Sequence, residues 1–380
     1  MSLNSSKESS VVSTPGSVAS HYNAVPNSGL QERTNSRIYH LRNFNNWMKS
    51  MLISDFIERL RHEGCPSATV LDLCCGKGGD LLKWKIGNIK SVVMTDVADV
   101  ALNHCRNRYE ELRDRFARER RQPFDAHFIH ADATQDILRD SYPDRNMQFD
   151  IVSCQFALHY SFASEQSARR LLSNAADALR PGGYFIGTLP DGSSIMNFLR
   201  KSDDGIFRND VVKVTYTGNT IVSRITSHLL FGIFPLLIKI LDEFDMELVY
   251  HHSFPDAVKY YLENNPREAR PLMNRMRALE VYPPFPSNPL VGNETEYEHA
   301  SEKMKELNAG PNERMGTLSK SEWEVVSMYL VFAFRKKSAK NSLLCLRSYT
   351  PLYVHCCCCC CVPRKFFNLL SLIFAFFWFE

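Results

Sequence analysis

A glycine-rich turn is the stretch of this 380-residue sequence whose residue types are best suited to holding a ligand. It lies in VLDLCCGKGGDLLKWK, residues 70–85, where an apolar run is followed by Gly76, Gly78 and Gly79 and then by apolar residues at helical spacing. Glycine has no Cβ, so the backbone can turn tightly and a ligand can lie against it. A strand, turn and helix of this kind opens the cofactor site of a doubly wound α/β domain. An α/β turn that holds no ligand is the alternative.

Two carboxylates accompany the turn, and they favour one class of ligand. Asp72 lies on the predicted strand before the glycines, and Asp96 ends the next apolar run, SVVMT at 91–95. Asp96 takes the place where such folds hold a ribose. The glycine spacing differs from the G-x-G-x-x-G of dinucleotide-binding folds, and an acid before the turn suits a cation better than a pyrophosphate. S-adenosylmethionine carries an ammonium and a sulfonium, so it is the cofactor that we expect.

Four motifs extend this pattern along the chain. They are LDLCCGKGGDLLKWK, TDVADV, CQFALHYSF and PGGYFIGTLPD. Together they resemble the messenger-RNA cap guanine-N7 methyltransferases of eukaryotes, from near Arg37 to about Lys337. The resemblance implies a class I S-adenosylmethionine-dependent methyltransferase, a Rossmann-like α/β fold with a mostly parallel seven-stranded sheet and helices on both faces. The implied reaction moves a methyl group from S-adenosylmethionine to N7 of the guanine in GpppN, the 5′ cap of mRNA.

The resemblance also assigns cofactor-binding residues. The residue matching Lys49 meets the cofactor carboxylate, Asp132 lies beside the adenine amino group, and Gln155 and Tyr160 face the cofactor. The whole cofactor-binding set is Lys49, Asp72, Cys74, Gly76, Asp96, Asp132, Gln155 and Tyr160. Read without the resemblance, Asp132 is an ordinary surface acid after a strand, and Tyr160 is aromatic packing.

A second set of residues is implied to hold the cap. It comprises Asn45, Asn46, Lys77, Lys83, Arg108, His159 and Tyr329. Lys77, Lys83 and Arg108 would offset the charge of the triphosphate, because lysine and arginine are the usual phosphate partners. His159 faces the guanine, but N7 has a lone pair and no proton to lose, so positioning alone can supply the catalysis without an acid, base or metal. Taken alone, these residues read as polar positions on amphipathic helices and as aromatic packing.

Hydrophobic periodicity predicts the elements that must position these side chains. The expected helices are at 37–60, 99–121, 164–179 and around 271–279. The expected strands, besides the two already given, are at 128–132, 149–154, 184–190, 246–254 and 328–335. The stretch Arg180–Gly183 should stop the third helix, and a polar loop should run to about Leu318. The last two strands resemble the pair that closes the sheet in this class of methyltransferase.

Charge and cysteine usage bound what the chain can be. The formal net charge of +3 is nearly balanced, so an RNA partner would have to be held by a local basic patch. The cysteines before residue 338 form no C-x-x-C pair and have no His at zinc spacing, which favours reduced thiols in an intracellular protein and no metal site. The start, MSLNSSKESS, lacks the apolar core of a secretory signal.

Three regions are expected. Residues 1–31, rich in Ser, Asn, Pro and Gly, are predicted to be a disordered tail, and 32–337 to be the methyltransferase domain. Residues 338–380 are an atypical tail outside the fold, with six consecutive cysteines and the apolar run Phe366–Phe379. That run is shorter than the roughly 20 residues that span a bilayer, so we expect no stable membrane association. The resemblance implies a nuclear location, and it leaves open an activating subunit or contact with the transcription or capping machinery.

Two departures from the family pattern motivate a rival hypothesis. Between about Val214 and Ile233 the family has a strand pair and a glutamate that faces the guanine, whereas this chain is shorter and has no Glu there. Such a carboxylate would stabilise the positive charge that methylation places on the base. Cys74 stands where the first family glycine belongs, and it should weaken cofactor binding unless the backbone is extended.

The alternative function is therefore a catalytically weakened S-adenosylmethionine- or RNA-binding regulatory variant. A nicotinamide-dependent oxidoreductase is a third hypothesis, which the glycine spacing disfavours.

Overall fold

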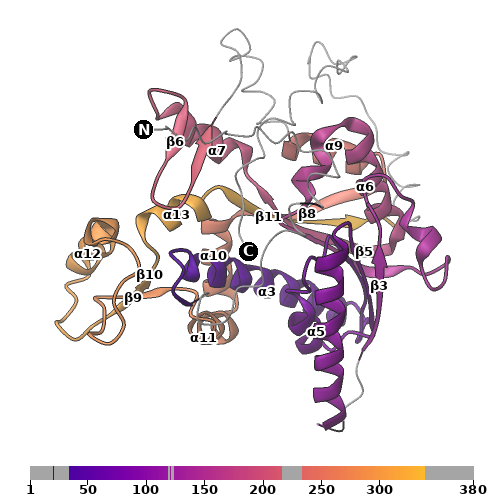
Figure 1. Cartoon of the computed structure of the whole chain (residues 1–380), viewed down its shortest axis with the longest axis horizontal. Coiled ribbons are helices and arrows are strands. Elements are labelled where there is room, and N and C mark those ends of the chain that lie inside the picture. The colour runs from indigo at the N-terminus through magenta and orange to yellow at the C-terminus, as the bar shows by residue number, and fades with distance from the viewer. Residues whose placement is uncertain (1–19, 21–33, 119, 121–123, 216–232, 339–380) are drawn as a thin grey trace, which may run out of the picture.

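The computed structural model describes residues 34–118, 124–215 and 233–338, together with residues 20 and 120. The predicted tails at 1–31 and 338–380 lie almost wholly outside these ranges. Residues 216–232, where the family glutamate is missing, also lie outside them. Within the described ranges the chain builds one large sheet between two layers of helices (Figure 1).

The central sheet has seven strands in the order β3-β2-β1-β4-β5-β11-β8. Their bounds, in that order, are Asp125–His130, Ser91–Asp96, Thr69–Leu73, Phe149–Gln155, Leu179–Pro190, Tyr329–Lys336 and Met246–Ser253. The first five strands run parallel, and β11 is antiparallel to both of its neighbours. The predicted fold class is confirmed, including the late strand pair that closes the sheet.

Both faces of the sheet are buried, because successive strand residues point to opposite sides. On β1, Val70 joins one apolar cluster and Leu71 the other. The cluster of Val70 includes residues from α3, α4, α5, α7, α10, α11 and α13. Their bounds are Tyr39–His62, Leu81–Ile86, Asp99–Arg118, Gly192–Arg200, Phe254–Asn264, Pro266–Arg275 and Lys320–Val326. The cluster of Leu71 includes α6 (Glu165–Ala178) and α9 (Ile233–Asp242).

Smaller elements lie away from the central sheet (Figure 1). The strands β6 (Ile206–Arg208) and β7 (Lys213–Thr215) form an antiparallel pair just before the undescribed residues 216–232. A second pair, β9 (Glu280–Tyr282) and β10 (Met315–Thr317), lies near α12 (Glu298–Glu306). Short 3-10 turns occupy η1 (Leu138–Ser141), η2 (Leu158–Ala163) and η4 (Glu294–Tyr297).

The structure corrects several predicted boundaries. Arg180–Gly183 does follow a helix, but it belongs to β5 rather than to a loop. The helix predicted around 271–279 is α11, which begins at Pro266 and contains Pro271 inside it, where the packing of Ala269 and Met273 supports it. The predicted polar loop contains β9, α12 and β10, so that prediction was wrong. Its Glu- and Lys-rich sequence has too few apolar residues to show a helical stripe.

Candidate functional site

The glycine-rich turn joins β1 to α4 through left-handed backbone. Gly76 has φ of +53° and Gly78 has φ of +74°. A Cβ on Gly78 would lie 2.6 Å from Sγ of Cys105, so this glycine lets α5 pack against the turn. A Cβ on Gly76 would meet nothing within 4 Å. The turn is therefore packed on one side and open at Gly76.

Cys74 begins this turn with φ of +55°, in the left-handed region. The backbone is thus not extended, so the conformation that would let the cofactor tolerate a cysteine here is not present. A left-handed non-glycine residue costs roughly 1–2 kcal/mol. A hydrogen bond with the thiol of Cys154, followed by burial, raises the pKa of Cys74 well above its usual value. The Cys74 thiol therefore stays protonated at neutral pH.

Asp96 is the last residue of β2, and its side chain hydrogen-bonds to the turn from this neighbouring strand. Its Oδ2 accepts a hydrogen bond from the backbone N–H of Gly76 at 2.7 Å, and its Oδ1 accepts one from the N–H of Ala98 at 2.8 Å. The side chain is buried. Charge-assisted bonds of this kind fix a carboxylate's orientation. The structure therefore places Asp96 beside the open side of the turn.

Four charged side chains gather where α3 crosses the start of α4, and we call Lys49, Asp72, Asp80 and Lys83 the charged quartet. Nζ of Lys49 lies 2.9 Å from Oδ1 of Asp80, and Nζ of Lys83 lies 2.8 Å from the same atom. Lys83 also donates to Oδ1 of Asn46. Lys83 is buried, so it is not presented to solvent as a phosphate ligand in this arrangement.

The members of the quartet shift one another's pKa values. Burial and the charge of Asp80 raise the pKa of Asp72 to about 7. Burial opposes ionisation of Asp80, but Lys49 and Lys83 hold its pKa well below the usual value. Burial lowers the pKa of Lys83 to about 8, although Asp80 acts in the opposite direction. Asp72 is thus the member that titrates near neutral pH, and it accepts a hydrogen bond from Nε1 of Trp84 at 3.0 Å.

Two further predicted cofactor residues lie at or just beyond the ends of β4 and β3. Gln155 is the last residue of β4, and its Nε2 donates to Oγ of Ser153 at 3.0 Å. Its Oε1 is buried and has no hydrogen-bond partner among the described residues. Asp132 lies two residues beyond β3 and accepts from the N–H and hydroxyl of Thr134 at 2.9 and 2.6 Å.

Phe156, just after β4, has the backbone conformation least expected from its residue type. Its φ is +58°, and its N–H donates to Oγ1 of Thr188 on β5 at 2.8 Å. Its ring packs edge-on against Tyr329, with ring centroids 5.3 Å apart, and against Phe254 at 6.1 Å. Strained backbone of this kind is common at functional sites. The Thr188 hydroxyl and these rings hold Phe156 in place.

His159 and Tyr160 lie in the loop that follows, and their ring centroids are 4.1 Å apart. Burial lowers the pKa of His159 to about 3, so the imidazole is neutral at physiological pH. Burial, and then the proximity of Tyr160, raise the pKa of Tyr329. The structure therefore brings His159, Tyr160 and Tyr329 together as an uncharged aromatic group.

The remaining residues predicted to hold the cap lie on α3, the turn and α5. Asn45 is buried on α3, and its Oδ1 has no hydrogen-bond partner in the described part of the chain. Arg108 on α5 is exposed, and its Nη1 donates to the backbone carbonyl of Lys77 at 2.9 Å. Arg108 and Lys77 are thus adjacent, while Lys83 lies inward with Asn46.

Sequence reasoning missed Asp80, Thr188 and Phe156 as members of the site. Asp80 had a usable signal, because it is the acid that follows the glycines, at the N-cap position of α4. Thr188 had none, because its role depends on the register that sets Gln155 opposite it. Phe156 had none either, since a phenylalanine gives no sign of left-handed backbone.

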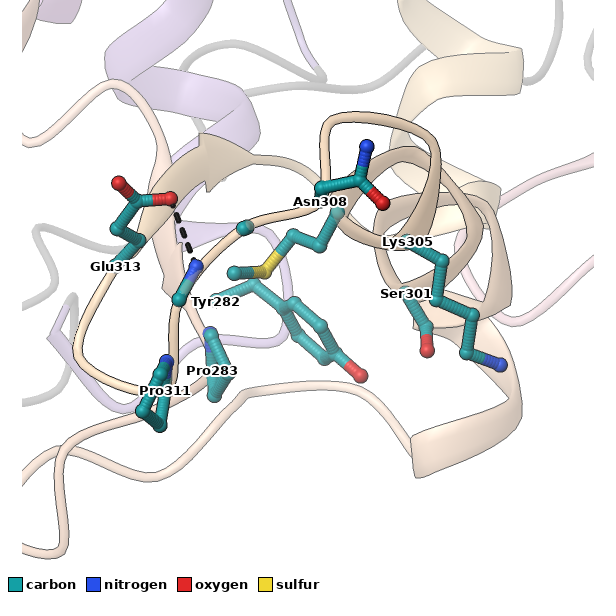
Figure 2. Close-up of a pocket in the computed structure, with 10 residues that line it drawn as sticks. Tyr282, Pro283, Ser301, Lys305, Asn308, Pro311 and Glu313 are labelled. Carbon is teal, nitrogen blue, oxygen red and sulfur yellow. Dashed lines mark hydrogen bonds between the residues drawn. The ribbon is translucent and has the colours of Figure 1, made fainter.

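A separate pocket of about 290 Å³ lies between the β9–β10 pair and α12 (Figure 2). Tyr282, Ser301, Lys305 and Pro311 line it, and none of the predicted site residues does. Within the described ranges, no group of three or more His, Cys, Asp or Glu side chains could hold a metal ion. No helix of the described residues is both long and apolar enough to cross a membrane.

Comparison with known proteins identifies relatives of this chain. A family model described as the mRNA (guanine-N(7))-methyltransferase domain matches residues 5–337. A Caenorhabditis elegans protein named mRNA cap guanine-N(7) methyltransferase is 42% identical over 344 residues, covering 85% of this chain and 87% of the relative. A Drosophila melanogaster protein of the same name is 37% identical over 337 residues, covering 84% of this chain and 76% of the relative. Among solved structures, a plantazolicin methyltransferase in complex with SAH covers 85% of this chain and 95% of its own at 11% identity, with a TM-score of 0.42.

Proposed function

Because the chain belongs to the mRNA (guanine-N(7))-methyltransferase family, we propose that it transfers a methyl group from S-adenosylmethionine to N7 of the guanine cap, GpppN, of mRNA. The observation that carries this proposal is the family match, which extends over residues 5–337 and so includes every predicted site residue. The comparisons do not favour the weakened regulatory variant over an active enzyme. The family match also disfavours the nicotinamide-dependent oxidoreductase.

The residues present fit S-adenosylmethionine, which supplies the methyl group when bound. Gly76 leaves open space against the turn, and Asp96 beside it can receive hydroxyl groups of a ribose. Oε1 of Gln155 is a buried acceptor whose partner is missing among the described residues. Lys49 can meet a carboxylate, and ionised Asp72 favours a cation. We infer that Asp132 and Tyr160 complete the cofactor-binding set, with Cys74 as a neutral wall.

The uncharged aromatic group suits a reaction that needs no proton transfer. His159 is neutral, because its pKa is about 3, and cannot serve as an acid near pH 7. It can still orient the guanine by hydrogen bonding, beside Tyr160 and Tyr329. Good orientation of two reactants can lower a barrier by roughly 7–11 kcal/mol. We infer that these side chains act by holding N7 in line with the methyl donor.

The cap would enter from the side of α3 and α5. Asn45 offers a buried acceptor, and exposed Arg108 with half-buried Lys77 beside it forms a basic pair that fits the triphosphate. Lys83 contributes from inside the charged quartet, through Asn46, rather than as a direct phosphate ligand. This differs from the direct contact predicted from the sequence.

The direct test is methyl transfer from labelled S-adenosylmethionine to GpppA-capped RNA, with the product nucleoside identified after digestion. We expect 7-methylguanosine from GpppA-capped RNA, and no incorporation into triphosphate-ended or already N7-methylated RNA. Incorporation into adenosine instead, or none into GpppA-capped RNA under conditions where S-adenosylmethionine binds, would contradict the proposal.

The proposed function also bears on where the protein acts in the cell and on which proteins it contacts. We infer a nuclear location, because newly made mRNA is the substrate, and an activating subunit or contact with the capping machinery as a partner. Fluorescence microscopy of the tagged chain tests the location. Co-purification followed by a turnover assay, with and without the partner, tests activation.

A further inference from the structure

Three arginines form a row along one side of α5, which we call the arginine row: Arg108, Arg115 and Arg118. Their spacing places them on the same side of a helix, and all are exposed. Glu111 lies within the row and Asp114 lies one turn before Arg118, so three arginines and two carboxylates give this side of α5 a net charge of +1. Arg108 donates to the backbone carbonyl of Lys77 at 2.9 Å. The row therefore starts beside the glycine-rich turn and runs away from it along α5, a long helix in Figure 1.

The arginines on the opposite side of α5 have partners of a kind that the arginine row lacks. On that side Arg113 is ion-paired with Glu110, and Arg106 lies over the ring of Phe128 at 5.6 Å. Among the described residues, no carboxylate forms an ion pair with any member of the arginine row. An exposed row of cations without carboxylate partners attracts phosphate groups.

The neighbouring helix α4 brings another cation against α5 and carries two exposed apolar side chains. Nζ of Lys85 lies 4.5 Å from the ring centroid of Phe116, which follows Arg115 on α5. Leu82 and Ile86, one turn apart on the outward side of α4, are 59% and 69% exposed. Large apolar side chains with such exposure can contact the riboses or bases of a nucleic acid.

We propose that the arginine row binds the phosphates of the RNA chain that follows the cap. This inference rests on the proposed function, which places the triphosphate at Lys77 and Arg108. The row spans about 15 Å from Arg108 to Arg118 at the rise of an α-helix, which accommodates a few nucleotides. The enzyme would thus favour capped RNA over the isolated cap dinucleotide, without reading the sequence.

The alternative occupant is a partner protein with acidic and apolar residues. RNA is favoured because the row is continuous with the pair that receives the cap's own phosphates. A bound capped RNA already has its next phosphates close to this surface. A protein partner would not explain why the row begins at Arg108, beside Lys77.

The test compares two substrates in the same kinetic assay: the dinucleotide GpppA and a GpppA-capped RNA of about twelve nucleotides. The variant is Arg115→Gln combined with Arg118→Gln, and the matched control is Arg113→Gln on the opposite side of α5. We expect the double variant to raise KM for the capped RNA roughly two- to tenfold, since each exposed charge contact contributes modestly. KM for GpppA and for S-adenosylmethionine should stay unchanged, and the control should match wild type.

A second measurement does not depend on turnover. Fluorescence anisotropy with labelled capped RNA should show a shallower salt dependence in the double variant, by roughly 0.7 in the log–log slope for each lost phosphate contact. Unchanged RNA binding would assign the row to another partner, such as an acidic protein, and overturn the inference. An equal rise of KM for both substrates would also overturn it. If the wild type methylates neither substrate but binds RNA through the row, the proposed function fails and this inference stands.

Discussion

The candidate site has a turn side, formed by the charged quartet, and a strand-end side, formed by His159, Tyr160 and Tyr329. The first holds its polar groups as charges and the second holds them neutral. On the turn side, the Asp80 carboxylate lies within ion-pair distance of the Lys49 and Lys83 ammonium groups, and Asp72 lies close enough to interact with them electrostatically. On the strand-end side, His159, Tyr160 and Tyr329 gather without a charge, and burial keeps the imidazole neutral. The contrast matches two ligands of different kinds: an amino acid with fixed charges, and a planar base whose reacting atom carries only a lone pair.

The largest effect should come from removing the carboxylate that both lysines share. Asp80→Asn keeps the side-chain shape but leaves Lys49 and Lys83 without their common partner. Breaking a buried ion pair in this way typically costs about 3–5 kcal/mol. We expect urea denaturation to show a free energy of unfolding lower by about 3 kcal/mol, toward the low end because Lys49 is partly exposed.

The control for that prediction is Asp114→Asn on the exposed side of α5. Surface substitutions of this kind usually change stability by less than about 0.5 kcal/mol. If Asp80→Asn were as mild as the control, the quartet would contribute little to folding and the contrast between the two sides would lose its energetic basis.

On the strand-end side, the matching test removes the hydroxyl that holds Phe156. Thr188→Val leaves the Phe156 N–H without an acceptor, which typically costs about 1–3 kcal/mol. Because Phe156 packs against Tyr329, we expect KM for capped RNA to rise more than the dissociation constant for S-adenosylmethionine.

Thr188→Ser keeps the hydroxyl and should restore the KM for capped RNA. Calorimetry for the cofactor and steady-state kinetics for the RNA separate the two ligands. A Thr188→Val variant that weakened both equally would show that Thr188 supports the whole fold rather than the base side of the site.

The two sides should also differ in their response to pH. The pKa of Asp72 is raised to about 7, so its ionised fraction, and with it the affinity for a cation, should increase as pH rises through that value. We expect S-adenosylmethionine binding to tighten by up to about tenfold per pH unit below about pH 7 and to level off above it.

The same shift has a stability consequence of opposite sign. A folded-state pKa above the unfolded value means that the contribution of Asp72 to the stability of the ligand-free protein falls as pH rises from about 4 to about 7. Asp72→Asn should remove the part of both pH dependences that is centred near pH 7, whereas His159→Gln should leave it in place because His159 is neutral throughout. Calorimetric titrations of each variant between about pH 6 and 8 check the binding half, and retention of the pH dependence in Asp72→Asn would refute it.

Cys74→Gly should give the smallest effect. Glycine relieves the left-handed strain at φ of +55°. It also gives the unfolded chain more conformational freedom, which lowers the free energy of unfolding by roughly 0.5–1 kcal/mol. We expect a free energy of unfolding within about 1 kcal/mol of wild type and cofactor binding at least as tight. A clear loss of cofactor binding would show that the Cys74 thiol is used.

Much of the sheet was predictable because strands such as β1 and β2 are short apolar runs that end at turn residues or acids. Val70 to Leu73 and Ser91 to Thr95 carry that pattern in a few adjacent residues, and both strands form there. The third strand, predicted at 128–132, is β3 at Asp125–His130, because its partly exposed residues give a weaker pattern. The polar stretch up to Leu318 lacked the pattern, and its helix α12 went unseen. Local pattern is enough where burial is complete and fails where an element is mostly exposed.

The site divides in the same way. Asp72, Gly76 and Asp96 follow from strand ends and glycines, and Asp96 does contact the turn. The quartet does not follow from the sequence, because Lys49 and Asp80 meet only when α3 packs across α4. That contact joins residues far apart in the chain, and no periodicity records it. The same packing buries Lys83, which was predicted to offset the charge of the triphosphate.

The position of β11 has a consequence for how the chain is synthesised. This strand, Tyr329–Lys336, lies between β5 and β8 and pairs with both. Until it has left the ribosome, the edges of β5 and β8 present unpaired backbone groups for as long as the intervening residues take to be translated. Exposed apolar strand edges promote aggregation, so nascent chains of this protein should depend on chaperones until residue 336 emerges.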